Sequence, residues 1–550
     1  MNKYLATLLL LSFFSLSRTH AQESYRVNYK VTYNGKPVPS QSPVVIGNRQ
    51  ETLITSNAIL TNTGSIPYQE SVIDASNSYL YTQATLKPGA LIAMLDSTAL
   101  KNQTFELTNE TKQIAGYTCR KAKTTVNSNR IELWFTNELP LKGSPSVLGS
   151  KLGLVLEFSR NGDYVITAEK VEKTTNSPHL VLSQVKALPL MNALTYNELL
   201  WKSRYTTVPV LEKARLNFSG ETPTSDSLLA FRQGLAQVKR IKFPKFKPGS
   251  RIFLDVTQKS LGDAYDRTGT VFLIPASKIK TENGKLVYIG EKGKEKDFAI
   301  ASPGYEPNVE LMRFFTSFGA GLAQANGFQI KGKEWAQENF FRQEVTDIAS
   351  LLSGEEIYLG VQIENYDAKG HLVSANLTIH QEETASTFEK VIPLFNSLDV
   401  FEAKGDELRN LFKGKEGLKM TFTLDKPLKN ARIRFLTTGH GGWENGDEYL
   451  RKPNTLYLNG VKVFEVIPWR EDCGSYRMQN PISGNFANGL SSSDYSRSNW
   501  CPGTITNPYY IELGDLKAGT HTLQLIIPQN PDEGPSYSQW NVSGVLIGKE

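Results

Sequence analysis

One acidic residue lies at the mouth of a predicted strand with an aromatic and a cationic neighbour. Asp266 precedes the apolar run 271–274 and stands between Tyr265 and Arg267. A neighbouring cation keeps a carboxylate ionised, and an ionised carboxylate at a strand end can act as a base on a polar substrate. Taken alone, this stretch favours a turn aspartate that caps its own backbone beside a surface arginine.

Two further acidic residues have similar surroundings. Glu364 follows a strand-like segment and has Tyr366 two residues on, while Glu448 precedes Tyr449 and follows a glycine-rich stretch that contains His440. An aromatic ring beside a carboxylate can form a wall on which a sugar stacks. Most isolated surface carboxylates are simply solvated, so each of these residues carries weight only in combination.

A fourth segment combines an arginine and an aromatic residue with a cysteine. Arg497 and Trp500 come directly before Cys501, and Cys473 opens the Gly-, Ser- and Asn-rich loop that Cys501 closes. Three cysteines in an oxidising compartment give one pair and one leftover, and this loop gains most from a covalent tie, worth about 3 kcal/mol. Cys119 has no histidine near it in sequence, so we expect a buried free thiol rather than a catalytic one.

Composition and missing motifs exclude several kinds of chemistry. The chain has 550 residues with 61 Lys and Arg against 55 Asp and Glu, a surplus too small to indicate nucleic acid as a partner. We find no nucleophile elbow, P-loop or dinucleotide-binding motif, and the histidines lack the spacing of a zinc site. We therefore expect neither metal nor cofactor. Carboxylates, arginines and aromatics remain, as in proteins that handle sugars.

The N-terminal residues are typical of a signal peptide. Lys3 gives the basic start, residues 5–16 form the apolar stretch, and Ala21 is the small residue before the expected mature start at Gln22. We expect a protein that is secreted or periplasmic. No later stretch reaches the length of a transmembrane helix. We also expect a monomer.

Strand signals dominate the rest of the chain. Residues 251–256, 431–436 and 520–525 alternate polar and apolar side chains, and Asn459-Gly460 joins two strand-like runs as a hairpin turn. Short strands at frequent spacing predict an all-β fold. The predicted organisation is a signal peptide at 1–21, a β-rich block at 22–185, a connector at 186–204 with a helix near 192–201, and two further β domains at 205–388 and 389–550.

The motifs resemble those of the peptide-N-glycosidase F family, bacterial amidases that remove N-glycans from asparagine. The resemblance covers roughly residues 205–548, and its most specific part is Arg-x-x-Trp-Cys-Pro-Gly at 497–503. It implies two adjacent antiparallel jelly-roll sandwiches whose interface brings the three acidic residues together. The family also implies the pairing of Cys473 with Cys501.

The resemblance assigns roles to the acidic and cationic residues. Asp266 corresponds to the primary catalytic carboxylate, whereas Glu448 and Glu364 are implied to position water and bind the sugar or the peptide amide. Arg267 and Arg497 are implied to orient Asp266 and to donate hydrogen bonds to substrate oxygens.

The aromatic positions are the implied sugar-binding residues. The resemblance assigns substrate binding to Tyr265, Tyr449, Trp500, Tyr366 and His440. Some of these differ from the family, which has Trp at the positions of Tyr265 and Tyr449, and this difference bears on sugar preference. Two disulfides that some members carry around the aspartate and the second glutamate are absent, which leaves those loops to be held by packing alone.

The N-terminal block lies outside the minimal enzyme. Its segments near 117–122, 131–136 and 148–158 resemble the GLPGLI family of envelope proteins. The block also fits the bowl-like domain found on some longer peptide-N-glycosidases, so we expect an accessory role.

The resulting hypothesis is hydrolysis of the amide between the first N-acetylglucosamine and asparagine in N-glycosylated proteins or glycopeptides. The alternatives are a glycan-binding envelope protein without turnover and an endo-β-N-acetylglucosaminidase, which cuts between the two core sugars. The presence of all three acids and both arginines argues against a pure binder.

Overall fold

The computed structural model consists of two compact units, Met1–Arg204 and Tyr205–Glu550. The predicted signal peptide lies outside the residues that the structure describes. Among the described residues, no helix is long and apolar enough to cross a membrane. The structure describes residues 23–175, 178–218, 228–231, 234–274, 279–282, 285–288, 307–320, 335–381, 386–398, 410–441, 446–482 and 490–550.

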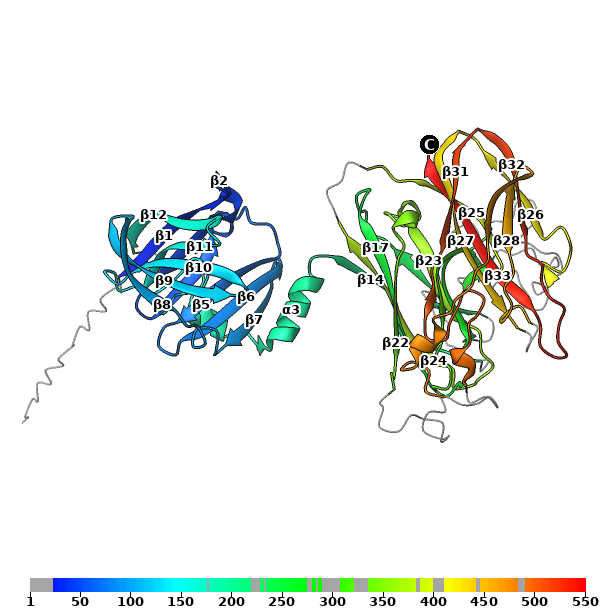
Figure 1. Cartoon of the computed structure of the whole chain (residues 1–550), viewed down its shortest axis with the longest axis horizontal. Coiled ribbons are helices and arrows are strands. Elements are labelled where there is room, and N and C mark those ends of the chain that lie inside the picture. The colour runs from blue at the N-terminus through cyan, green and yellow to red at the C-terminus, as the bar shows by residue number, and fades with distance from the viewer. Residues whose placement is uncertain are drawn as a thin grey trace, which may run out of the picture. The chain divides into compact units, whose positions relative to one another are not determined.

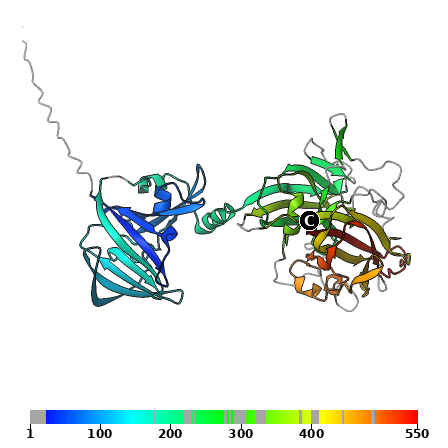
Figure 2. The same cartoon turned by 90° about the horizontal axis from the view of Figure 1, so that it is seen from above.

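The first unit is one large, mostly antiparallel sheet (Figures 1 and 2). The strand order is β13-β7-β6-β5-β4-β3-β1-β12-β11-β10-β9-β8, with β2 paired to β1. The strands are β1 (Ser24–Tyr33), β2 (Lys36–Pro37), β3 (Pro43–Gly47), β4 (Glu51–Ser56), β5 (Tyr68–Asp74), β6 (Tyr79–Lys87), β7 (Ala90–Asp96), β8 (Glu106–Ile114), β9 (Tyr117–Val126), β10 (Asn129–Thr136), β11 (Leu154–Arg160), β12 (Tyr164–Thr174) and β13 (Leu190–Met191).

The expected connector packs as part of this unit. Its predicted helix is present as α3 (Ala193–Lys202), where the Asn192 side chain caps the first turn by accepting from the Thr195 N–H at 2.9 Å. Tyr196 and Leu200 bury one face of α3 against the sheet. The shorter helices of the unit are η1 (Pro39–Gln41), α1 (Asn57–Leu60) and α2 (Leu182–Lys186).

The leftover cysteine is a buried free thiol, as predicted. Cys119 lies on β9 within the main core of the first unit. Burial raises the pKa of its thiol to about 12. At neutral pH the group is therefore a thiol rather than a nucleophilic thiolate.

Two face-to-face sheet pairs make up the second unit, so the predicted all-β fold is confirmed. In the first sandwich, one sheet has the order β14 (Thr206–Leu216), β24 (His371–His380), β17 (Arg251–Ser260), β22 (Asn339–Glu344). The facing sheet has the order β15 (Leu228–Phe231), β16 (Ala236–Lys242), β23 (Glu356–Ile363), β18 (Thr268–Ile274), β21 (Val309–Phe315), β30 (Ile505–Thr506). A separate hairpin pairs β19 (Ile279–Glu282) with β20 (Lys285–Tyr288).

The second sandwich also has two sheets, and buried apolar side chains fill the space between them. One sheet has the order β25 (Lys390–Asn396), β33 (Gln539–Lys549), β27 (Leu428–His440), β31 (Tyr509–Leu516). The other has the order β26 (Leu418–Leu424), β32 (Gly519–Ile526), β28 (Asn454–Leu458), β29 (Val461–Val466). The predicted hairpin turn joins β28 to β29, with φ of 52° at Asn459 and 81° at Gly460. Short 3₁₀ helices of the second unit are η5 (Thr346–Leu351), η7 (Cys473–Tyr476) and η8 (Ser492–Asp494).

The two sandwiches share strands and core. Strand β30 comes from the C-terminal half of the chain but pairs with β21 of the first sandwich. Val391, Val545 and Ile547 of the second sandwich belong to the buried cluster of the first. The packing between the sandwiches therefore uses residues from both sides of the predicted boundary near residue 388.

Buried arginines cross the interface between the sandwiches. Arg313 on β21 donates to Glu310 at 2.7 Å, to Thr438 Oγ1 at 2.9 Å and to the Asn541 carbonyl at 2.7 Å. In the other direction, Arg434 on β27 donates to the Glu310 carbonyl at 2.8 Å. Because every partner is buried, these bonds fix the position of one sandwich against the other.

We predict that Arg313→Met lowers the free energy of unfolding by about 3–5 kcal/mol, because it leaves the Glu310 carboxylate buried without its cation. Arg251→Met is a matched control, since Arg251 pairs with Glu344 on the exposed face of the first sandwich, where such a pair is worth about 1 kcal/mol or less. Urea unfolding followed by tryptophan fluorescence compares the two. Equal losses would show that the buried pair does not hold the interface.

Candidate active site

Carboxyl groups from the two sandwiches meet at one buried guanidinium. Asp266 lies in the loop between β17 and β18, Glu448 lies in the loop after β27, and Arg497 lies between η8 and β30. Arg497 Nη1 donates to Asp266 Oδ2 at 3.1 Å and also to Glu448 Oε1. The side chain of Arg497 is 1% exposed, whereas each carboxylate is 16% exposed. The cation is therefore enclosed while the two acids keep an opening to solvent.

Aromatic rings and backbone bonds hold Arg497 in place. Its guanidinium carbon lies 4.3 Å from the ring centroid of Trp500 and 5.3 Å from that of Tyr449. Its Nη2 donates to the Ser492 carbonyl, and its backbone exchanges two hydrogen bonds with Arg470, at 2.9 and 3.0 Å. A guanidinium stacked on rings and bonded at both ends keeps one orientation. It can therefore act as a fixed point between the two acids.

Trp500 is a buried support for Arg497. The residue is 3% exposed, stacks on Phe315 at 4.5 Å between ring centroids, and donates its indole N–H to the Gly439 carbonyl at 2.9 Å. The expectation from the sequence placed Trp500 in the wall of a sugar groove. The structure instead encloses the ring between Phe315 and Arg497, which leaves almost none of it to contact a ligand.

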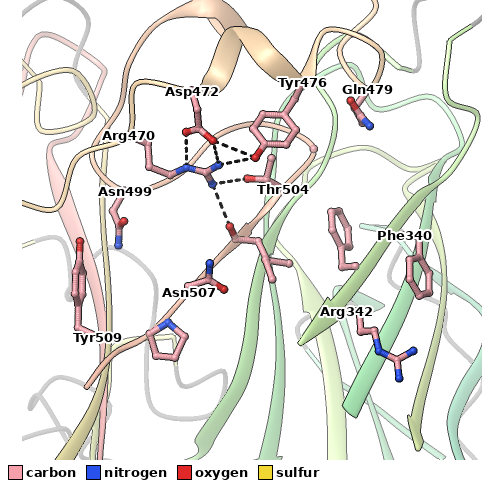
Figure 3. A pocket seen from close by; sticks show the side chains of 14 residues that line it. Phe340, Arg342, Arg470, Asp472, Tyr476, Gln479, Asn499, Thr504, Asn507 and Tyr509 are labelled. Carbon is pink, nitrogen blue, oxygen red and sulfur yellow. Dashed lines mark hydrogen bonds and ion pairs between the residues drawn. The ribbon is translucent and has the colours of Figure 1, made fainter. Parts of the chain in front are cut away.

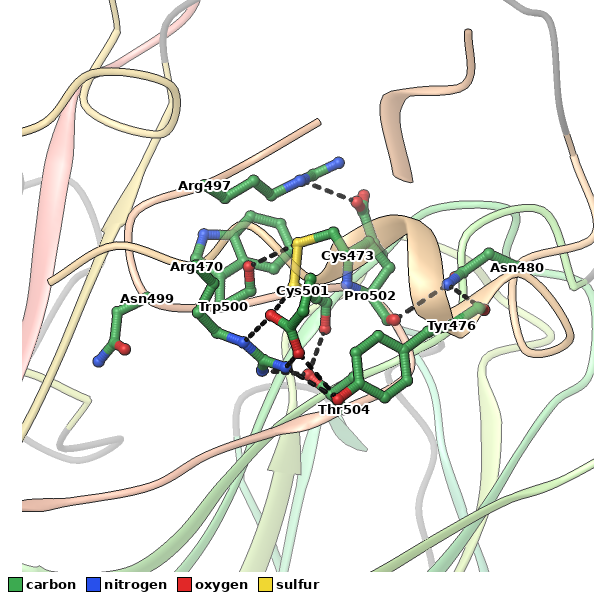
Figure 4. The surroundings of a disulfide bond; sticks show 12 residues. Arg470, Cys473, Tyr476, Asn480, Arg497, Asn499, Trp500, Cys501, Pro502 and Thr504 are labelled. Atoms are coloured by element: carbon green, nitrogen blue, oxygen red, sulfur yellow. Dashed lines mark hydrogen bonds and ion pairs between the residues drawn. A yellow bond between two sulfur atoms is a disulfide. The ribbon is translucent and has the colours of Figure 1, made fainter. Parts of the chain in front are cut away.

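The predicted disulfide is confirmed and braces this segment (Figure 4). Cys473 in η7 and Cys501 are bonded, with 5.1 Å between their Cα atoms. Asn499 and Gly503 on either side of Cys501 have φ of 68° and 77°, so the chain turns sharply around the bond. A side chain at Gly503 would place its Cβ 2.8 Å from the Cβ of Gln479. The glycine of the motif is thus required by both backbone conformation and space.

The surroundings of the two acids favour a retained proton. Burial raises the pKa of both Asp266 and Glu448 above the ordinary carboxyl value, and the charge of Arg497 opposes this rise. The negative charge of Asp266 raises the pKa of Glu448 further. Two partly buried acids that share one cation titrate as a pair, so one can be ionised while the other holds a proton.

Glu364 lies at the end of β23, which pairs with β18, the strand that follows Asp266. It comes directly after β23, and its backbone N–H donates to the Thr268 carbonyl at 3.0 Å. Its Oε1 accepts from Gln362 Nε2 at 3.4 Å. Glu364 therefore shares the end of the sheet with Asp266, whereas Arg497 bonds the other two acids directly.

Arg267 turns away from the role that the resemblance implies. Its Nε and Nη2 donate to the two carboxylate oxygens of Asp263 at 2.7 and 3.2 Å. Its positive charge still lowers the pKa of Asp266, although burial outweighs that effect. The physical reason for the orientation is that Asp263 is buried and needs a cation. Arg267 thus affects Asp266 through its positive charge and through its bonds to Asp263 in the same loop.

Sequence reasoning missed the buried polar chain behind this loop. His371 Nε2 lies 3.4 Å from Asp263 Oδ2, its Nδ1 lies 2.9 Å from Gln258 Nε2, and Gln258 Oε1 accepts from Asn339 at 2.8 Å. Burial opposes ionisation of Asp263, but the hydrogen bonds from His371 and Arg267 prevail and lower its pKa to about 2. No local motif signals this chain, because its members come from four separate segments.

The exposed aromatic residues flank Arg267. Tyr265 is 60% and Tyr366 is 80% exposed. The guanidinium of Arg267 lies 4.9 Å from the ring centroid of Tyr265 and 5.9 Å from that of Tyr366. Phe218, which the sequence did not single out, packs edge-on against Tyr366 at 5.9 Å. These rings offer apolar faces beside the acids, as a sugar-binding wall requires.

His440 is buried and neutral. Its Nε2 lies 2.7 Å from Thr438 Oγ1, and its ring packs beside Trp500. Burial, together with the charges of Arg313 and Arg497, lowers its pKa to about 3. The histidine is predicted to contact substrate, but the structure places it beneath the site as a polar part of the core. Within the described part of the chain, no group of three or more His, Cys, Asp or Glu side chains is arranged to hold a metal ion.

The second unit is thus an all-β pair of sandwiches with carboxylates at their interface. Comparison with known proteins identifies the family to which this architecture belongs. Residues 207–379 match the family model for the N-terminal part of peptide-N-glycosidase F, and residues 407–547 match that for its C-terminal part. Residues 27–198 match the model described as the N-terminal domain of N-glycanase peptide. The chain belongs to the peptide-N-glycosidase F family.

Solved structures extend the similarity over the whole chain. A structure of PNGF-II in the C2 space group is 41% identical, covers 96% of this chain and 98% of that one, and superposes with a TM-score of 0.84. A structure of PNGF-II in the P21 space group is 42% identical, with coverage of 96% and 99% and a TM-score of 0.85. None of the curated proteins matches the chain.

We predict that Arg497→Met lowers the free energy of unfolding by about 3 kcal/mol at pH 7, because two partly buried carboxylates lose their enclosed cation. In the variant, the folded-state pKa of both acids lies still further above the unfolded value, so the loss shrinks as the pH falls toward about 4. Urea unfolding across this range measures it. Arg451→Met, which removes the partner of the exposed Glu471, is the control and should change little; a pH-independent loss for Arg497→Met would contradict the pairing.

Asp263 should stabilise the protein at neutral pH and lose this effect in acid. Its folded-state pKa of about 2 lies below the unfolded value, so its contribution is complete above about pH 4 and is lost as the pH falls toward 2. We predict that Asp263→Asn costs about 2 kcal/mol at pH 7 and much less near pH 2. Stability against pH, measured beside the exposed-site variant Asp425→Asn, checks this. The idea fails if the Asp263→Asn loss persists unchanged in acid.

Proposed function

We propose that the protein is a peptide-N4-(N-acetyl-β-glucosaminyl)asparagine amidase. The reaction is hydrolysis of the amide between the first N-acetylglucosamine and asparagine, which leaves aspartate in the peptide and releases the intact glycan as a glycosylamine. The observation that carries the proposal is the Asp266–Arg497–Glu448 arrangement, in which two partly open acids from different sandwiches share one fixed cation. Membership of the peptide-N-glycosidase F family supports it.

Asp266 is the proposed base. It accepts a proton from the attacking water as the water oxygen bonds to the amide carbon. The C–N bond then breaks, and the nitrogen leaves with the sugar after gaining a proton. Glu448, whose pKa is raised by burial and by the charge of Asp266, is suited to supply or hold that proton. Arg497 keeps both acids in register and offsets the negative charge that develops on the carbonyl oxygen.

Glu364 and the exposed rings are the proposed substrate contacts. Glu364 shares a sheet end with Asp266 and is assigned to the sugar or to the peptide amide. Tyr265, Tyr366 and the half-buried Tyr449 are assigned to the first two sugars. Because Tyr is smaller than the Trp found in the family at two of these positions, the wall leaves more room around the sugar. The proposed chemistry uses side chains alone, without a metal or cofactor.

The compartment follows from the same proposal. N-glycoproteins and glycopeptides are extracellular substrates, and the Cys473–Cys501 bond requires an oxidising environment to form. The apolar N-terminal segment with its small-residue end is the proposed signal for export. We propose a secreted or periplasmic monomer that begins at Gln22.

We predict that mature protein converts the glycosylated asparagine of an N-glycopeptide to aspartate, and that Asp266→Asn lowers this rate by at least about a thousandfold because the base is lost. Asp425→Asn is the matched control and should retain activity, because Asp425 is exposed before the start of β27 whereas Glu448 follows the other end of that strand. Mass spectrometry of the peptide and of the released sugar reads both changes.

Other products would contradict the proposal in distinct ways. A peptide that keeps one N-acetylglucosamine on asparagine would make the protein an endoglycosidase. A glycopeptide that is bound but never cleaved would make it a glycan-binding protein. Full activity of Asp266→Asn would remove the assigned base while leaving the amidase reaction in place.

A further inference from the structure

A hollow in the second unit lies apart from the paired acids (Figure 3). It has a volume of about 680 Å³, and neither Asp266, Glu448 nor Arg497 lines it. This is within the range of small-ligand pockets, roughly 300–1,000 Å³. Figure 4 places the Arg497 side chain on one side of the Cys473–Cys501 bond and the Arg470 guanidinium on the other. We call this hollow the disulfide groove, because Tyr476, Gln479 and Asn499 of the loop that the disulfide closes line it.

Aromatic rings stand on opposite walls of the disulfide groove. Phe340 on β22 of the first sandwich is 64% exposed, although it is large and apolar. Tyr509 opens β31 of the second sandwich and packs beside Phe464 at 6.0 Å. Figure 3 shows Phe340 and Tyr509 facing the groove from its two sides. The exposed ring of Phe340 offers a flat apolar surface to a ligand rather than to the core, whereas Tyr509 is half-buried and offers only the part of its ring that is not packed against the second sandwich.

The charged groups of the groove are already neutralised. Arg470 donates to Asp472 at 2.7 and 2.9 Å, to Thr504 Oγ1 at 2.9 Å and to the Ile505 carbonyl at 3.1 Å. Arg342 pairs with Asp255 at 3.2 Å. An anionic or cationic ligand would therefore find no unpaired counter-charge, and the groove favours a neutral one.

Side-chain amides provide the polar contacts. Gln479 and Asn507 line the groove, and their side chains make no hydrogen bond within the described part of the chain. Asn499 donates its Nδ2 to the Thr437 carbonyl at 2.9 Å. An amide offers both donors and acceptors, which matches hydroxyl groups that do the same. Flat apolar walls with uncharged amides between them are complementary to a sugar chain.

We infer that the disulfide groove binds a neutral oligosaccharide, with Phe340 and Tyr509 stacking on sugar faces and with Gln479 and Asn507 bonded to hydroxyls. The site is separate from the paired acids and does not depend on turnover. Because one braced segment supplies Arg497 to the acids and Asn499 to the groove, the disulfide holds both sites in fixed relation. The groove is thereby placed to hold a branch of a glycan while another part of the molecule reaches the acids.

The test is calorimetric titration of the full mature chain. The probe is a free neutral oligomannose N-glycan, titrated alone and with excess chitobiose. We expect binding that chitobiose does not remove and that Phe340→Ala weakens by about tenfold, as loss of one stacked ring implies. Asn507→Ala should weaken it in the same direction. Tyr33→Ala removes an exposed ring of the first unit and should leave it unchanged.

Three results would overturn the inference. The first is no binding of the oligomannose glycan. The second is binding that chitobiose abolishes and that Phe340→Ala leaves intact, which would place the glycan at the paired acids alone. The third is equal binding of an unglycosylated peptide with the same dependence on Phe340, which would make the groove a peptide site. Failure of the amidase reaction would leave this test unaffected, since the free glycan has no linkage to asparagine that the protein could cleave.

Discussion

One buried guanidinium determines how the second unit must be built. Arg497 bonds an acid from each sandwich, and a charge so enclosed is tolerated only when its partners are held in place. The sandwiches therefore cannot slide past one another without breaking the pairing. Arg313 and Arg434 also form hydrogen bonds across this interface and so hold the sandwiches in place. Ser543 of the second sandwich donates to Glu310 of the first at 2.5 Å. The geometry of the site therefore depends on the contacts that hold the interface.

The electrostatics are divided between groups that keep a proton and groups that do not. Asp263 is fixed in its ionised form by Arg267 and His371, whereas burial and mutual repulsion raise the pKa of Asp266 and Glu448. The loop before β18 thus carries one acid that holds the structure and one that is available for chemistry. The absent disulfides are offset at this loop by a buried ion pair and not, as the sequence suggests, by packing alone.

The segment from Cys473 to Cys501 links the two proposed sites. Its turns are set by the disulfide and by residues with positive φ, and its backbone pairing of Arg470 with Arg497 sends one guanidinium to the acids and the other to the disulfide groove. A glycan is branched, so an enzyme that contacts it at two places gains orientation from both. Because this segment is rigid, the binding free energies of the two contacts would add.

The sequence alone determined the all-β class, the hairpin at Asn459-Gly460, the helix α3, the disulfide and the family, because alternation, turn chemistry and short motifs are local. It also singled out Asp266, Glu448 and Arg497. Only the tertiary structure decided that Arg267 bonds Asp263, that Trp500 and His440 are buried, and that His371 and Gln258 stand behind the loop. Those outcomes depend on which charges are left without water when distant strands pack, and no local pattern along the chain records that.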